Sequence, residues 1–317
     1  MKRIFVVLLA LAVICSLSAT AFAAPIFVNV GTGSQGGTYY PVGSAMATIW
    51  NRVIPNMRAA VQSTGGTRAN IQLMANGEVE VGFTDGLYYF AYNGMRDFTG
   101  NAQSFLRGTI PLYPEPIHLM AAEGSGIKSI KDIKGKRVAI GAAGSGIEST
   151  CRVLLKDVLG IDPDKDISAQ NLGMGESAGA LADKAIDVAF MMGGVGSAAV
   201  VEVMTMRTGY LIPLEDDVVA GLNKALPYYS AFSIPANSYS GQPEPVKVSA
   251  TWNVLSMHEK LDTDLVYAMT KALFDNKNDL VNVAAIMSFM NASEIDVIKI
   301  PLHPGAEKYY KEIGVLK

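Results

Sequence analysis

The sequence has 317 residues, of which 50% are hydrophobic and 17% are charged, and its formal net charge at pH 7 is −3. This apolar composition excludes a disordered chain, and the length allows two domains that each have a core. The weak negative charge lacks the positive field that nucleic-acid binding requires, so no nucleic acid is expected as a partner.

The N-terminus has the layout of a secretory signal peptide. Basic residues at positions 2 and 3 precede an apolar stretch over 4–15, and an Ala-x-Ala motif ends at Ala23. We therefore predict that residues 1–23 form a signal peptide cleaved after Ala23 and that the mature protein is periplasmic. The mature chain then carries 24 basic and 29 acidic side chains, a net charge of −5, which does not favour an anionic membrane surface.

Two patterns of strands, glycine loops and helices occur twice along the mature chain. In the first, a strand, a loop and a helix are predicted at 26–30, 31–38 and 41–53, and again at 137–140, 141–146 and 147–159. In the second, a loop precedes a helix and a strand at 63–83, and again at 172–190. The repeats are separated by a constant 107 residues, which predicts two lobes of similar topology.

Alternating strands and helices imply an α/β fold with a parallel sheet in each lobe. We predict that lobe I comprises residues 24–121 with about 252–317, and that lobe II comprises about 122–251. Two connections between the lobes imply a hinge and a central cleft. Ligands of such sheets lie where strands end and helices begin, and helix N-termini attract anions, so the cleft is expected to bind a small anion.

The glycine loop also matches a dinucleotide-binding fingerprint, Gly31-x-Gly33-x-x-Gly36. That fingerprint requires an acidic residue about 20 positions further on. The first carboxylate after the loop is Glu78, which is much too distant. The pattern therefore favours an anion-binding loop over a nucleotide site, and no cofactor is predicted.

A second enzymatic alternative is a serine hydrolase. The run Gly175-Glu176-Ser177-Ala178-Gly179 matches a nucleophile elbow, and a downstream His258 or His303 would complete the required order. An oxyanion segment does not precede it, and the repeat places Ser177 where the first lobe has Asn70. The hydrolase is kept as the alternative to a non-catalytic binding protein.

The remaining reactive side chains have structural interpretations. His118, His258 and His303 share no ligand spacing, so no metal site is predicted. Cys151 is expected to be an inert cysteine inside a helix. Asp85 and Glu176 lie beside glycine loops, where a carboxylate serves either as a helix cap or as a partner for a ligand ammonium group.

Several motifs in order resemble the solute-binding subunits of tripartite ATP-independent periplasmic (TRAP) transporters, specifically the TAXI family. The resemblance covers nearly the whole mature chain. It rests on the loop 31–41, Ser63-Thr64-Gly65-Gly66 with Asn70, Leu112-Tyr113-Pro114-Glu115, the run 134–138, Gly144-Ser145-Gly146 with Glu148, Glu176-Ser177, and the tail 301–306.

This resemblance implies a two-lobed periplasmic-binding-protein fold of type II-like arrangement that closes on a small carboxylate, such as glutamate, glutamine or 2-oxoglutarate. The protein would be a monomer that delivers its ligand to TRAP membrane permease subunits, or alternatively presents it to a sensory receptor. The residues expected to bind the ligand are Ser34, Gly36, Gly37, Thr38, Tyr39, Thr64, Gly65, Gly66, Asn70, Asp85, Ser145, Gly146 and Glu176.

Two departures from the family pattern concern ligand choice. Ile147 replaces a threonine that follows Ser-Gly in the family, and Met174-Gly175 replaces a Tyr-Ser pair. Both changes remove a hydroxyl from the second lobe's side of the cleft. They predict a ligand that differs from glutamate and is bulkier or more apolar.

Overall fold

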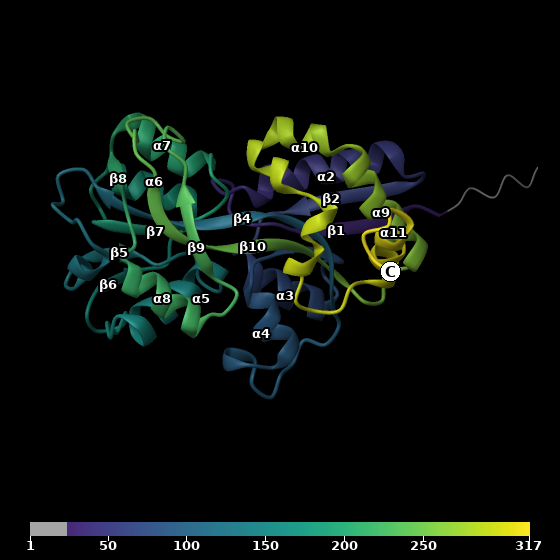
Figure 1. Ribbon diagram of the computed structural model, residues 1–317, viewed down its shortest axis with the longest axis horizontal. Helices are drawn as coiled ribbons and strands as arrows, with labels where there is room; N and C mark the ends of the chain where they lie inside the picture. The colour runs from purple at the N-terminus through teal and green to yellow at the C-terminus, as the bar shows by residue number, and fades with distance from the viewer. Residues whose placement is uncertain (1–23) are drawn as a thin grey trace, which may run out of the picture.

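The computed structural model describes residues 24–317 (Figure 1). The predicted signal peptide, residues 1–23, lies outside the described residues. None of the described helices is both long and apolar enough to cross a membrane.

The chain forms two α/β lobes joined by two long strands, as predicted (Figure 1). Lobe I contains β1 (Ile26–Gly31), β2 (Met57–Gln62), β3 (Val81–Thr84), α2 (Tyr39–Val53), α3 (Thr67–Asn76), α4 (Leu87–Asn93), α9 (Thr263–Asp275), α10 (Lys277–Val283) and α11 (Pro304–Glu312). Lobe II contains β5 (Arg137–Ala139), β6 (Ser168–Gln170), β7 (Val188–Met192), β8 (Gly209–Ile212), β9 (Ser230–Ile234), α5 (Gly146–Val153), α6 (Met174–Ala182), α7 (Ala198–Met206) and α8 (Asp216–Ala225).

The two sheets have equivalent strand orders. With β4 (Leu106–Ala122) and β10 (Val246–His258) included, lobe I has the order β2-β1-β3-β10-β4, and lobe II has the order β6-β5-β7-β4-β8. In each lobe the first strand pairs in parallel with the second and third, and a strand shared with the other lobe runs antiparallel beside the third. The predicted repeat of 107 residues is confirmed by the first residues of α2 and α5, of α3 and α6, and of β3 and β7.

The strands β4 (Leu106–Ala122) and β10 (Val246–His258) connect the lobes and lie antiparallel to each other. One part of β4 pairs with β10, and its end pairs with β7 and β8 in lobe II. The pairing of β10 with β4 has register shifts between Trp252 and Val254 and between Leu255 and Ser256. The predicted lobe boundaries, at 121 and about 252, fall within these two strands, and dividing the chain there remains our proposal.

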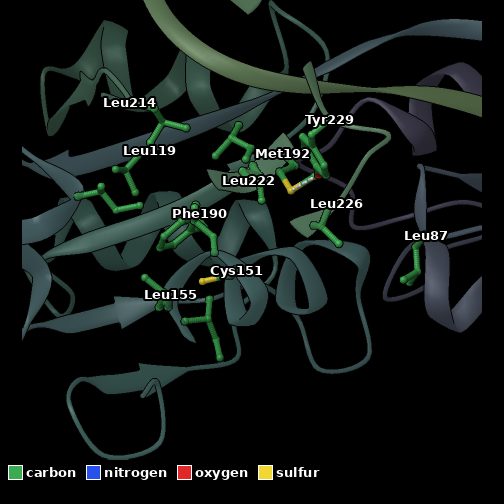
Figure 2. Close-up of a cluster of buried hydrophobic side chains, with 14 of the residues drawn as sticks. Leu87, Leu119, Cys151, Leu155, Phe190, Met192, Leu214, Leu222, Leu226 and Tyr229 are labelled. Atoms are coloured by element: carbon green, nitrogen blue, oxygen red, sulfur yellow. Dashed lines mark hydrogen bonds between the residues drawn. The ribbon is translucent and has the colours of Figure 1, made fainter. Parts of the chain in front are cut away.

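Buried side chains fill the space between the sheets and their helices. Figure 2 shows part of this core, in which Cys151 of α5 lies near Leu155 and Phe190. Cys151 is 1% exposed, and burial raises the pKa of its thiol well above the usual value. Since the reactive form of cysteine is the thiolate, this residue is an inert part of the core, in agreement with its interpretation from the sequence.

Candidate functional site

A pocket lies between the lobes where four helices begin. Lobe I contributes the N-termini of α2 and α3, and lobe II contributes those of α5 and α6. The empty space amounts to about 480 Å³, including the part that opens to solvent. The lining residues are Gly33, Ser34, Gly37, Thr38, Tyr39, Gly65, Gly66, Thr67, Asp85, Glu115, Ala142, Ser145, Gly146, Ile147, Gly173, Met174 and Met192.

The helix N-termini give this pocket a positive partial charge. The first turns of α2 and α3 contain no acidic residue, and their N-cap residues Thr38 and Gly66 form no side-chain cap. In lobe II the backbone N–H groups at the start of α5 are partly satisfied, because Ser145 Oγ accepts from the Glu148 N–H at 3.0 Å. Unpaired N–H groups at the start of a helix bind carboxylates and other anions.

Two buried carboxyl groups also face the pocket. Asp85 follows β3 and is 4% exposed, and its Oδ1 accepts from the Leu87 N–H at 2.9 Å. Burial raises the pKa of Asp85 to about 6. Glu115 projects from β4 and is also 4% exposed, and burial together with the charge of Asp85 raises its pKa to about 8. Both groups are therefore held in a setting that disfavours their charged forms.

Nine predicted site residues line the pocket. They are Ser34, Gly37, Thr38, Tyr39, Gly65, Gly66, Asp85, Ser145 and Gly146. The pocket thus combines backbone from the glycine loops with four hydroxyl-bearing side chains, of which Ser34 lies in a loop and Thr38, Tyr39 and Ser145 lie at the starts of helices. This is the arrangement expected from the sequence, and ligand binding by these residues remains a proposal.

Two further predicted residues support the pocket from behind. Asn70 is fully buried, and its Nδ2 donates to the carbonyls of Thr32 (2.7 Å) and Phe83 (2.8 Å). Thr64 Oγ1 lies 2.7 Å from Asn70 Oδ1 and accepts from the Gly66 N–H at 3.0 Å. Neither residue lines the pocket, because their polar atoms are used to hold the loops that do.

The last two predicted residues also lie off the pocket. The Gly36 carbonyl accepts from the Ala199 N–H at 3.2 Å, so this glycine forms a contact between the lobes. Glu176 is exposed, and its Oε2 accepts from the Gly173 N–H at 2.7 Å. Of the two carboxylates considered for either capping or ligand binding, Glu176 is therefore a cap and Asp85 faces the pocket.

Lining residues that sequence reasoning did not select include Thr67 and Glu115. Glu115 belongs to a motif used for the family resemblance, but its neighbours gave no sign that the β4 strand carries it into the cleft. Ile147, Met174 and Met192 form the apolar side of the pocket. The first two are the positions at which the sequence departs from the family pattern.

The lobes are in contact around the pocket, so this is a closed form. The Gly194 N–H donates to Thr38 Oγ1 at 3.1 Å, and the Met174 N–H donates to Ser34 Oγ at 3.4 Å. Hydroxyl groups of lobe I thus accept hydrogen bonds from the backbone of lobe II. Part of the surface predicted to bind a ligand therefore also holds the lobes together.

The hydrolase alternative is not supported by the geometry. Ser177 is fully buried within α6, and its Oγ has no hydrogen-bond partner among the described residues. His258 Nδ1 accepts from the Lys260 N–H at 3.1 Å and its ring stacks on Phe105. His303 caps α11 by accepting from the Gly305 N–H at 3.2 Å. In residues 24–317 no group of three His, Cys, Asp or Glu side chains is placed to hold a metal ion.

The fold and pocket define the class: this is the two-lobed α/β fold of periplasmic solute-binding proteins, with a cleft at the hinge. The chain belongs to the NMT1-like family, whose sequence profile matches residues 30–314.

Solved structures with a similar fold have low sequence identity to the chain. A protein from Bordetella bronchiseptica RB50 is 13% identical, with 90% of this chain and 98% of that one covered and a TM-score of 0.52. The alkanesulfonate-binding protein from Xanthomonas axonopodis pv. citri bound to MOPS is 14% identical, with 91% and 84% covered and a TM-score of 0.49. A putative L-cystine ABC transporter protein from Listeria monocytogenes is 13% identical, with 82% and 95% covered and a TM-score of 0.49.

Proposed function

We propose that this protein is a periplasmic solute-binding protein that captures a small carboxylate by closing its lobes, without chemistry. The observation that carries this proposal is the meeting of four helix N-termini, two from each lobe, at one pocket. A carboxylate placed there receives backbone N–H groups from both lobes, so it stabilises the closed form more than the open one.

The lining residues fit an anion that is held without a cationic side chain. Among the described residues, those that line the pocket include no Lys, Arg or His. Each helix N-terminus contributes about 0.3–1 kcal/mol to a nearby negative charge, and more where the site is partly buried. Ser34, Thr38 and Ser145 add hydroxyl donors, because each of these hydroxyl oxygens accepts from a backbone N–H and can still donate its own O–H to the anion.

For the partner, we propose a TRAP-type membrane permease. The ordered motifs that resemble TAXI subunits support this choice, and the predicted signal peptide supports export to the periplasm. An ABC-type permease and a sensory receptor are the competing partners. Reconstitution in vesicles separates them: TRAP-dependent uptake requires an ion gradient, whereas an ABC permease requires ATP and a receptor gives no uptake.

Capture itself is tested by thermal unfolding of ligand-stripped protein against amino acids, 2-oxo acids, C4 dicarboxylates and branched-chain carboxylates. A specific ligand at about 100 times its Kd adds about 2.7 kcal/mol of stability, or roughly 5 to 10 °C. The amide of each positive compound is the control, since it lacks the anionic end. A flat panel, or equal shifts by acid and amide, would count against carboxylate capture.

A further inference from the structure

The acidic side chains of the pocket have no cationic partner within it. Asp85 and Glu115 are each 4% exposed and both line the space between the lobes. Arg68 acts on Asp85 electrostatically, but its guanidinium pairs with Asp97 and donates to Ser149 at 3.1 Å. A buried carboxyl group is stabilised either by taking up a proton or by pairing with a positive group, and the lining supplies no positive group for this pair.

Asp85 is oriented so that one oxygen remains directed across the cleft. Its Oδ1 accepts from the Leu87 N–H, which fixes the carboxyl group at the end of β3. Its Oδ2 lies so close to Gly146 that a methyl group on that glycine would be 2.1 Å away. This oxygen therefore faces the first residue of α5, at the junction of the two lobes.

The Glu115 carboxyl group is buried without a charged or backbone partner among residues 24–317, and the Tyr39 hydroxyl and the Asn253 amide are its polar neighbours. The Tyr39 hydroxyl, which lies beside it, donates to Asn253 Oδ1. The Asn253 Nδ2 and the Tyr113 hydroxyl have no partner among the described residues either. Buried polar groups are normally satisfied, so this cluster is complete only when a ligand or water joins it.

The other walls restrict what the ligand carries besides its positive group. The helix N-termini accept one carboxylate, but no lining side chain balances a second one. Ile147 and Met174 in the first turns of α5 and α6, together with Met192 at the end of β7, offer an apolar surface. A dicarboxylate would bring two negative charges to two acidic groups, which is unfavourable in a buried site.

We propose that the pocket binds an α-amino acid with an uncharged, apolar side chain, whose ammonium group lies against Asp85 and Glu115. This inference rests on the proposed function and narrows its ligand class. An ammonium group has three donors and its hydrogen bonds to carboxylates are charge-assisted, so it satisfies both acidic groups at once. Glu115 is thereby a specificity-determining residue that accepts amino acids and rejects the corresponding 2-oxo acids.

The experiment compares pairs of ligands that differ only in the amine. Titration calorimetry at pH 7.5 on the ligand-stripped mature protein uses leucine, methionine and valine, each with its 2-oxo acid, and glutamate with 2-oxoglutarate. We expect an apolar amino acid to bind at least about 100-fold more tightly than its 2-oxo acid, because the 2-oxo acid lacks the ammonium group that pairs with the buried carboxyls. We expect the same preference over glutamate, which adds a second carboxylate. Glu115→Gln and Asp85→Asn should each lower the affinity for the amino acid by about 10- to 100-fold. The affinity for the 2-oxo acid should stay unchanged or increase.

The matched control is Glu123→Gln, which makes the same change in an exposed carboxylate that follows β4 and does not line the pocket. It should leave both affinities unchanged. Equal binding of amino acid and 2-oxo acid, or tighter binding of glutamate, would overturn the inference and leave carboxylate capture intact. Binding of none of these compounds would reject the proposed function as well. The comparison in the unaltered protein decides the matter even if a variant fails to fold.

Discussion

Gly146 of lobe II lies against the carboxyl group of Asp85 in lobe I, so closely that a β-carbon on the glycine would be 2.1 Å from Oδ2. Gly146 begins α5 and its backbone has an ordinary negative φ, since it is absent from the positive-φ glycines of the described chain. The glycine is therefore required by the approach of the two lobes and not by its backbone conformation.

Gly146→Ala should consequently weaken ligand binding and leave folding intact. Overpacking costs about 1–3 kcal/mol, which is roughly a 5- to 150-fold loss of affinity if the cost is confined to the closed form. Calorimetry gives the affinity and urea denaturation the stability. Gly179→Ala is the control, because a β-carbon there meets no atom within 4 Å. Unchanged affinity in Gly146→Ala would show that ligand binding does not require this closed contact.

Thr64→Val tests whether residues behind the pocket act through its loops. The Thr64 hydroxyl holds Asn70 and the Gly66 N–H, so the variant should lower the free energy of unfolding by about 1–2 kcal/mol and also weaken binding. Thr64→Ser keeps the hydroxyl and should restore both. A loss of affinity with unchanged stability would instead indicate direct contact with the ligand.

Ser177→Ala separates the binding protein from the hydrolase. The Ser177 hydroxyl is buried in α6 without a partner, so its removal should leave stability unchanged or raise it by up to about 1 kcal/mol. Ligand affinity should not change. Esterase activity in the parent protein that disappears in this variant would contradict the assignment.

The carboxyl groups of Asp85 and Glu115 predict that the affinities for an amino acid and for a 2-oxo acid change in opposite directions with pH. In the closed form without ligand, burial raises the pKa of Glu115 to about 8 and that of Asp85 to about 6, so Glu115 holds its proton at neutral pH. An ammonium ligand stabilises the charged carboxylate forms of Glu115 and Asp85, so its binding releases protons from these groups. Its affinity should rise between pH 6 and 8, by at most about tenfold per unit for each proton released.

A 2-oxo acid should show the reverse trend, because an anion favours the protonated carboxyls. Asp85, Tyr39, Tyr113 and Tyr229 are the ionisable groups that act on or respond to Glu115, and none of the three tyrosines titrates in this range because burial raises their pKa values well above the usual value. Calorimetry in two buffers with different ionisation enthalpies measures the protons exchanged. Glu115→Gln should flatten both profiles; an unchanged profile would assign the protons elsewhere.

Much of the architecture could be predicted from local sequence. The glycine loops, the apolar periodicity and the repeat of 107 residues are properties of neighbouring positions, and they identified the helix starts that form the pocket. The positions of Ser34, Thr38 and Ser145 followed from this pattern, because residues at the start of a helix lie where the strand before it ends.

The roles of Glu115 and Asn70 depended on packing between distant segments. Glu115 reaches the pocket because β4 crosses from one lobe to the other beside β10, which no local pattern indicates. Asn70 has the polar amide expected of a ligand contact, yet its donors are taken by the carbonyls of Thr32 and Phe83. A polar residue near a glycine loop thus serves either the ligand or the loop, and only the fold distinguishes the two.

The central claim is that the lobes close on a small carboxylate, and small-angle X-ray scattering tests it most directly. The ligand-stripped protein should have a larger radius of gyration than the protein saturated with the tightest ligand of the panel. The scattering of the loaded protein should agree with the closed form described here, and Gly146→Ala should stay more open at the same ligand concentration. Identical scattering with and without a bound ligand would contradict capture by closure.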